Sequence, residues 1–399
     1  MATITRTIHD NRRILTWALY IIVTLLILAW LLPLIGAQRP YRLVQSTITG
    51  LLVGGVYALI ALGIVIINKA SGVFNFAHGW MMLLGGLIFY SFFTSSATGT
   101  ISPLAAIALS LLTMLMIVTT NGWRQLRNPR SVVILVVGTA VLSAALLITG
   151  ANIQFVQAII GASLGGILTG LVVERFAIRP LIGQPLFAMV LMTLALAELL
   201  HGVTQLTWGS VEIPLQVFNG VSQLGVPFPI RIDGGETLGG NIIIRTELLI
   251  AFVLALLAFG GFVAFFRYTN AGLSMRATAE NQKLAQSVGL RVRTILAIAW
   301  AIAALLAAVA GVLQGGATSL SLNMPLLALR AFPAVLLGGL ESIGGALVGG
   351  LVIGLVQEWA NLLFPGSQAG TELAPYLVLM IVLIIRPDGL FGQKRIERI

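Results

Sequence analysis

The sequence has 399 residues, of which 58% are hydrophobic and only 9% are charged, and its formal net charge is +10. Soluble domains usually carry about 25% charged residues, so a water-soluble globular protein is excluded. Stretches without Asp, Glu, Lys or Arg cover residues 70–123 and 131–173, whereas a helix crosses a bilayer with about 20 apolar residues. A membrane barrel would show short alternating strands instead. We therefore expect an all-α integral membrane protein.

Apolar segments long enough for membrane helices follow one another along the whole chain. They predict a single transmembrane domain over residues 1–399, a bundle of about 10–12 transmembrane or re-entrant helices. The first segment follows a basic start and is too long for a signal peptide, so it is expected to be retained. Segment 326–341 is short and contains Pro333, which favours a broken or re-entrant helix. The expected segments are 14–35, 46–67, 73–93, 103–120, 131–150, 155–173, 186–206, 246–266, 294–315, 326–341, 342–363 and 372–386.

Basic residues gather in the connections on one side of these segments, among them Lys69, the arginines of 124–130 and the loop 267–293. Cytoplasmic loops carry an excess of Lys and Arg, so both termini are expected to be cytoplasmic. The same placement beside apolar spans argues against nucleic acid as a partner. The long loop 207–245 then lies outside, and its Gly, Pro and β-branched residues favour short strands or a hairpin.

The long cytoplasmic loop, 267–293, has the pattern of a short amphipathic helix. Arg276 and Glu280 are four residues apart and can pair, and Lys283 follows three residues after Glu280. Gly289 ends the pattern where a helix favours a left-handed glycine. The apolar face is small, which suits a groove on a protein better than a lipid surface. Its residues are Leu273, Ala277, Leu284 and Val288.

No catalytic or metal-binding constellation is present in the sequence. It has no cysteine, and its three histidines form no metal-ligand motif. No phosphate-binding loop of the type G-x-x-x-x-G-K-[ST] occurs, so the chain should not hydrolyse ATP. We therefore expect neither an enzyme nor a bound cofactor or metal ion.

Charged residues in or beside the expected spans leave two interpretations open. Glu198 and His201 lie one helical turn apart and either face a cavity or pair with each other near the outer helix end. An ion-driven carrier would use carboxylates such as Glu198 and Glu341 as coupling sites. An ion-gradient-driven secondary carrier for small polar solutes is therefore the alternative function. The remaining charged residues of this kind are Glu358 and Arg330, which is expected near an outer helix end.

A polar segment, FNFAHG at residues 74–79, interrupts two apolar runs. Asn75 can cap the following helix by accepting from backbone N–H groups, and His78 faces the same side. We interpret the pair as a polar joint where a helix starts inside protein, with direct contact to a transported solute as the alternative. Elsewhere, glycines at four-residue spacing predict close helix packing: Gly345, Gly349, Gly350 and Gly354.

Four separated stretches point to one family. They are GLLVGGVYALIALGIVIINKASGVFNFAHGWMMLLGG (50–86), MRATAENQKLAQSVGL (275–290), LRAFPAVLLGGLESIGGALVGGLVIGLVQ (329–357) and RPDGLFG (386–392). In sequence, order and spacing they resemble the permeases of branched-chain amino acid ABC transporters. The resemblance covers nearly the whole chain.

The resemblance implies a multi-pass subunit of a bacterial inner-membrane importer, with a translocation path for branched-chain or other small amino acids, amides or urea. It implies two ATPase subunits that use the ATP, a second homologous permease in a heterodimer rather than a homodimer, and a periplasmic or lipid-anchored substrate-binding protein. Asn75, His78 and Glu198 are then expected at the translocation path or the polar helix joint. Loop 207–245 becomes periplasmic, and 267–293 becomes the coupling loop, with Arg276, Ala279, Glu280, Lys283, Ala285 and Gly289 facing the ATPase.

The chain departs from the family pattern in three places. Residues 94–152 look like an inserted two-helix hairpin, which we expect at the periphery, facing lipid. Two extra crossings preserve the sidedness of everything that follows. Glu341 stands where the family usually has a small residue, and Glu198 is not part of its usual pattern. Both departures leave the substrate preference open.

Overall fold

The computed structural model describes residues 32–97, 101–148, 153–215, 229–235, 239–280 and 282–392. The first expected span, 14–35, lies almost entirely outside them, and every other expected segment corresponds to a helix. The elements are α2 (Pro40–Ser71), α3 (His78–Ala97), α4 (Pro103–Val118), η1 (Trp123–Arg127), α5 (Pro129–Leu147), α6 (Gln154–Val172), η2 (Val173–Ile178), η3 (Arg179–Leu181), α7 (Leu186–Trp208), β1 (Ile230–Ile232), β2 (Ile242–Ile244), α9 (Thr246–Tyr268), α10 (Asn270–Glu280), α11 (Gln282–Ser287), α12 (Val292–Ala317), α13 (Pro325–Gly338), α14 (Ile343–Leu363) and α15 (Gln368–Ile385).

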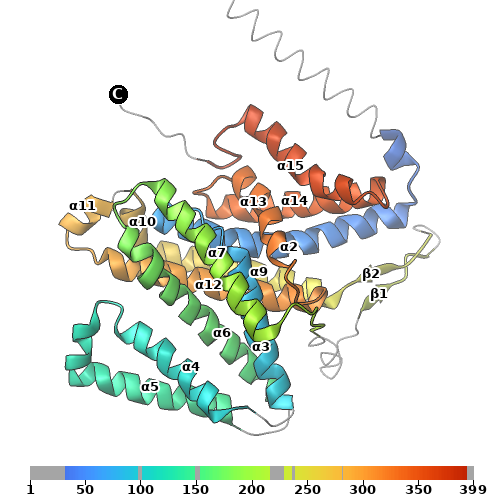
Figure 1. The fold of residues 1–399 in the computed structure, drawn as a ribbon. Coiled ribbons are helices and arrows are strands. Elements are labelled where there is room, and N and C mark those ends of the chain that lie inside the picture. The colour runs from blue at the N-terminus through green and yellow to red at the C-terminus, as the bar shows by residue number, and fades with distance from the viewer. Residues whose placement is uncertain are drawn as a thin grey trace, which may run out of the picture.

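Among the described residues, eight helices are long and apolar enough to cross a membrane, so the chain is a multi-pass helical membrane protein. Helices α10 and α11 and the turn between α4 and α5 lie at one end of the bundle, on the left of Figure 1, and the β1–β2 hairpin lies at the other. We call the first end the basic end, because its connections carry Lys69, Arg124, Arg175, Arg267 and Arg291.

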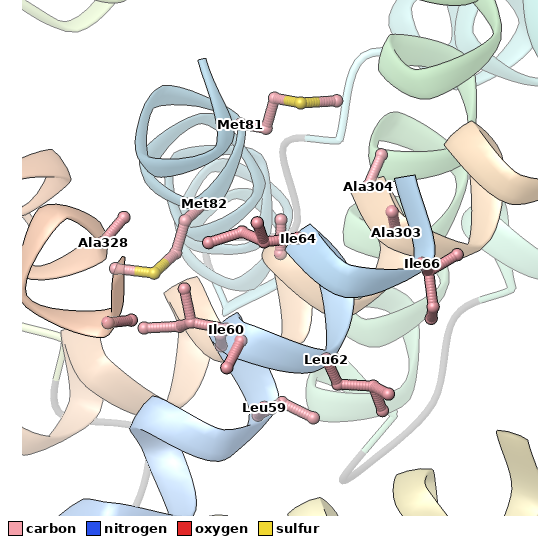
Figure 2. Close-up of a cluster of buried hydrophobic side chains, with 14 of the residues drawn as sticks. Leu59, Ile60, Leu62, Ile64, Ile66, Met81, Met82, Ala303, Ala304 and Ala328 are labelled. Carbon is pink, nitrogen blue, oxygen red and sulfur yellow. The ribbon is translucent and has the colours of Figure 1, made fainter. Parts of the chain in front are cut away.

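Helix α2 is the centre of the bundle. Its 32 residues extend over about 48 Å at 1.5 Å per residue, and every residue from Val56 to Ile67 is buried. A helix that is apolar on all sides must be enclosed by other apolar elements, and α9, α12, α13 and α14 pack around this one. Figure 2 shows its side chains in one cluster with Met82 of α3, Ala303 of α12 and Ala328 of α13.

Helix α14 uses its four spaced glycines on two faces. Gly350 and Gly354 face α2, whereas Gly345 and Gly349 face α13. A Cβ atom built at any of the four would lie 2.5 Å or less from a backbone atom of the facing helix. The absence of side chains therefore lets three helix backbones approach one another closely, where dispersion between packed atoms holds them.

Helix α13 is too short to cross a bilayer. Its 14 residues cover about 21 Å, against a hydrocarbon core of about 30 Å, and Pro333 lies inside it. Before it, Leu320 is buried and forms an isolated β-bridge with Ile213, with both N···O distances 2.9 Å. Irregular backbone inside a membrane protein needs such protein partners. The segment expected at 326–341 is therefore a short helix, but it continues through Pro333 without a break.

Helices α4 and α5 form a hairpin at the edge of the bundle (Figure 1). Each helix starts with a side-chain cap followed by proline, because Ser102 accepts from the Ala105 N–H and Asn128 from the Arg130 N–H. The hairpin packs on α6. Its outer helix, α5, keeps one row of apolar side chains exposed, as a lipid-facing helix does: Val133, Val136, Val137 and Val141.

The two long loops contain the expected kinds of structure. In 207–245, β1 and β2 pair antiparallel with Ile230 opposite Ile244, which confirms the predicted hairpin. In 267–293, helix covers Asn270–Glu280 and Gln282–Ser287, on either side of residue 281, which lies outside the described residues. The short helix expected in this loop is therefore present.

Candidate functional site

The turn between α2 and α3 brings polar groups into the middle of the bundle. Gly72 ends α2 with a φ of 71°, the left-handed conformation that glycine adopts without strain. The chain then returns along α2, because His78 lies beside Gly63. Gly63 lies about 12 Å before the end of α2 at 1.5 Å per residue. Helix α3 therefore starts inside the protein and not at its surface.

Asn75 stabilises this turn through both ends of its amide. The residue is fully buried. Its Oδ1 accepts a hydrogen bond from the Ala77 N–H at 3.1 Å, and its Nδ2 lies 3.4 Å from Sδ of Met81. A side-chain oxygen in this position satisfies a backbone donor just before the helix that would otherwise be buried without a partner.

His78 is buried without a hydrogen bond. Its ring has no exposed surface, and neither ring nitrogen has a partner among the described residues. The ring fits because residue 63 is glycine: a Cβ there would lie 2.5 Å from Cε1 and 2.9 Å from Nε2 of His78. Buried polar groups are normally paired. His78 thus offers a donor and an acceptor at the centre of the bundle that no described side chain uses.

Two neighbouring helices hold the turn in place. Oγ1 of Thr193 on α7 lies 3.3 Å from both the Phe76 nitrogen and the Phe74 carbonyl oxygen. Phe332 on α13 packs against both phenyl rings, with centroid distances of 4.5 Å to Phe74 and 5.4 Å to Phe76. A displacement of α7 or α13 would therefore disturb the turn that carries Asn75 and His78.

Helix α7 carries a carboxylate on its outer face. The Glu198 side chain is 80% exposed, and its Oε2 lies 3.5 Å from Nδ1 of His201. Trp80 of α3 stacks on His201 with a centroid distance of 4.4 Å. Glu198 is about 18 Å from the start of α7 and about 15 Å from its end. The two side chains are thus close enough to pair, as one of the two interpretations expected, but Glu198 lies nearer the middle of α7 than its end.

A carboxylate in the middle of a membrane helix is costly where it faces hydrocarbon. An acidic side chain at the centre of a bilayer costs about 2.5 kcal/mol or more, and such residues face the bundle interior or a water-filled cavity. In the isolated chain, however, Glu198 points away from the core. Water or another protein chain over the outer face of α7 around Glu198 would remove this cost.

The other charged candidates do not join this site. Glu341 lies in the turn between α13 and α14, where its carbonyl accepts a hydrogen bond from Lys69 Nζ at 2.9 Å. Arg330 pairs with Glu372 of α15 at 2.8 Å. The structure thus brings Asn75 and His78 together in one turn, links them to α7 through Thr193, and leaves Glu341 at the basic end.

The loop 267–293 exposes three apolar side chains: Leu273 is 58% exposed, Leu284 62% and Val288 70%. Gly289 has a φ of 85°, as its predicted capping role requires. Ala285 is buried and Ala279 is exposed. The side chains of Glu280 and Lys283 lie outside the described residues, so the predicted pairing of Arg276 with Glu280 stays a prediction.

Arg276 turns back toward the membrane helices. Its Nη1 donates to the carbonyl of Phe266 at the end of α9, and its guanidinium lies 5.3 Å from the centre of the Phe266 ring. Lys69 at the end of α2 lies 5.0 Å from the same ring. Two cations near one aromatic ring therefore connect α10 with α9 and α2.

Residues 131–385 match the model of a protein family described as the permease component of branched-chain amino acid transport systems. This stretch is more than half of the chain. The chain belongs to this permease family.

Known relatives align with the permease over most of their length. The high-affinity branched-chain amino acid transport system permease protein BraD of Pseudomonas aeruginosa is 27% identical over 362 residues, 90% of this chain and 99% of the relative. The corresponding protein LivH of Escherichia coli K12 is 27% identical over 359 residues, or 89% and 97%. A probable branched-chain amino acid transport permease of Methanocaldococcus jannaschii is 30% identical over 245 residues, or 59% and 74%. No solved structure matches the chain.

Several residues that shape the permease's central turn carry no signal in the sequence. Gly63, Thr193 and Phe332 are single small, hydroxyl or aromatic residues within apolar helices, and nothing in their local pattern distinguishes them. Only the fold shows that all three meet the segment 74–78.

Proposed function

We propose that the permease is a membrane subunit of an ATP-binding cassette importer that passes branched-chain or other small amino acids across a bacterial inner membrane. The relatives named above support the substrate class, because each is named as a permease of branched-chain amino acid transport. By the positive-inside rule the basic end faces the cytoplasm.

The observation that carries this proposal is the exposed carboxylate in the middle of α7. Glu198 is charged, about midway through an apolar span, and open on the outer face of the chain. A second, homologous permease that faces α7 across a water-filled path would remove the cost of this charge. Glu198, His201 and Trp80 then line the path, and the turn with Asn75 and His78 lies behind them, joined by Thr193.

The energy would come from two separate ATPase subunits that dock on α10 and α11. The three exposed apolar side chains of this loop are the surface they would cover, and the contacts of Arg276 and Lys69 with Phe266 would transmit the movement to α2 and α9. The ATPases shift the path between its two openings by binding one state more tightly than the other. A separate substrate-binding protein would deliver the amino acid on the opposite side. No cofactor or metal is assigned to this chain.

The transport proposal is tested by reconstitution in liposomes. The complete assembly, with both ATPases, the second permease and the binding protein, should take up leucine only when ATP is present. The permease alone should take up none under a proton or sodium gradient. Gradient-driven uptake by the isolated chain would favour the ion-driven carrier.

The position of the path is tested by thiol labelling, since the natural chain has no cysteine. Glu198→Cys places one thiol in the proposed path, and Val253→Cys places one on an exposed part of α9. Only thiolates in water react rapidly, so a membrane-impermeant maleimide should label residue 198 in the assembled importer and not residue 253. Equal protection of both would place Glu198 outside an aqueous path.

A further inference from the structure

A groove at the basic end lies between the α4–α5 hairpin and the bundle. It has a volume of about 360 Å³ and lies between the end of α4, α6 and the first half of α12. Along α12 the lining residues run from Thr294 to Leu305, which is about 16 Å at 1.5 Å per residue. One leaflet contributes half of a hydrocarbon core of about 30 Å. The groove therefore has the depth of one leaflet.

The lining of the groove changes from polar to apolar along this depth. Its polar residues, Thr120, Asn121, Gln125 and Thr294, come from segments at the basic end. Deeper along α12 it is lined by Ala301 and other aliphatic side chains. Such a gradient matches a molecule with a polar head at the membrane surface and a hydrocarbon chain below it.

Four arginines lie on or next to the segments that form the polar mouth of the groove. Arg179 donates to the Thr120 carbonyl at 2.9 Å, and Arg175 donates to Thr119 Oγ1 at 2.6 Å while stacking on Trp123 at 4.3 Å. Arg124 and Arg293 are exposed and adjoin the lining residues Gln125 and Thr294 in sequence.

Acidic residues are scarce in the segments of chain that form this mouth. Glu174 is the only acidic residue between positions 70 and 197, and it is bound to Arg179 at 2.6 Å. The segment 281–340, which includes the start of α12, contains no Asp or Glu. The mouth therefore carries an uncompensated positive charge, and basic pockets between helices on the cytoplasmic side are sites for anionic lipid headgroups.

Gln125 provides a separate sign of a ligand. Its Oε1 lies buried without a hydrogen-bond partner among the described residues, and the residue lines the groove. A buried acceptor without a partner is unfavourable. A hydroxyl group on the bound molecule would supply the missing donor.

We propose that this groove binds an anionic glycerophospholipid of the cytoplasmic leaflet, of the phosphatidylglycerol type. Its phosphate lies among Arg124, Arg175 and Arg293, a headgroup hydroxyl donates to Gln125, and one acyl chain fills the groove between α4, α6 and α12. The lipid thereby fastens the α4–α5 hairpin to the bundle. The assignment relies on the orientation proposed above but not on the transported substrate.

The test is native mass spectrometry of the full chain in detergent, titrated separately with phosphatidylglycerol and phosphatidylcholine. Phosphatidylglycerol should bind more tightly to the natural chain. The double variant Arg124→Gln, Arg293→Gln should lower that affinity about thirtyfold, since each basic residue near an anionic surface contributes about 1 kcal/mol. The matched control Arg267→Gln, Arg386→Gln removes two exposed charges from elsewhere at the basic end and should leave it unchanged.

A filling variant tests the acyl chain, because Ala301→Trp should reduce binding of both lipids. If that variant fails to fold, as judged by gel filtration, the arginine pair still decides the matter.

Equal affinity for the two lipids, or an unchanged affinity in the Arg124, Arg293 variant, would overturn the proposal. Loss of bound phosphatidylglycerol on assembly with the second permease would also overturn it, because a protein would then cover the groove. Failure of leucine uptake would not affect these results.

Discussion

At the scale of single residues, the central turn depends on a glycine that faces a histidine. Gly63 leaves the space that the His78 ring fills, and Ala303 of α12 closes the same space from another side. The ring is enclosed on all sides, so it has little freedom to move away from a new atom. Close-packed interiors of this kind respond to the addition of a single methyl group.

We predict that Gly63→Ala destabilises the permease by about 1–3 kcal/mol, because the new methyl group overlaps the His78 ring. The measurement is unfolding in mixed micelles followed by tryptophan fluorescence. Gly202→Ala in α7 is the control: a Cβ there meets nothing within 4 Å, so it should be neutral or slightly stabilising. The double variant Gly63→Ala, His78→Ala should lose less stability than the sum of its single changes. Strict additivity would mean that the two residues do not share this space.

At the scale of helices, α14 is held by contacts between backbones. Its glycines face α2 on one side and α13 on the other, so the helix joins the central span to the short helix α13. A hydrogen bond of 2.5 Å between the Tyr57 hydroxyl of α2 and Oε1 of Gln357 of α14 lies in the same interface. Because lipid gives little hydrophobic driving force between helices, close approach supplies much of their association.

The α2–α14 contact predicts opposite outcomes for two glycines of one helix. In Gly354→Ala the new Cβ would overlap the backbone of Gly50 and Gly54, so the helices must separate, at a cost of about 1–3 kcal/mol. In Gly344→Ala the new Cβ meets nothing within 4 Å, and stability should stay the same or rise. Thermal unfolding in detergent distinguishes the two. Equal effects would show that these glycines do not determine the contact.

The helix pair α10 and α11 yields a prediction about partner binding. Gly289→Val places a β-branched residue at a φ of 85°, which costs about 1–2 kcal/mol, and should reduce recovery of the ATPase in pull-downs from detergent extracts. Gly183→Val is the matched control. Gly183 has a φ of 88°, and a Cβ built there, as at Gly289, meets no atom within 4 Å. Unlike Gly289, it lies outside this loop. It should retain the ATPase. If both variants lose it, the effect is general destabilisation and the docking assignment fails.

At the scale of the whole molecule, the permease is a bundle around α2 with a separate hairpin at its edge. The hairpin packs on α6 and is tied to it by a few polar contacts, chiefly Gln157, whose amide nitrogen donates to the carbonyls of Leu146 and Ile148 at 2.9 and 2.7 Å. Gln157 also contacts Ser96 at the other end of the insertion. The two ends of the hairpin are therefore close together.

We predict that residues 101–148 can be replaced by a short Gly-Ser linker without loss of membrane insertion or of transport by the complete importer. Stability should fall, because removal of the hairpin leaves the Gln157 amide without its carbonyl partners. Adding Gln157→Leu to the deletion should restore part of the loss. Uptake of leucine and protease accessibility of the loops are the measurements. An assembled, correctly oriented complex without transport would show that the hairpin is part of the path.

The sequence by itself determined the number and placement of the described spans, the hairpin in 207–245, the short helix with Pro333 and the capping glycine at 289. These follow from hydropathy, glycine, proline and charge, which act locally along the chain. The pattern of FNFAHG also predicted that a helix starts inside the protein there. Tertiary structure alone decided that Gly63 accommodates His78, that Arg276 turns to Phe266, and that Glu198 lies on an open face of α7. Each of these depends on which helices pack side by side. Contacts between residues distant in sequence decide that packing.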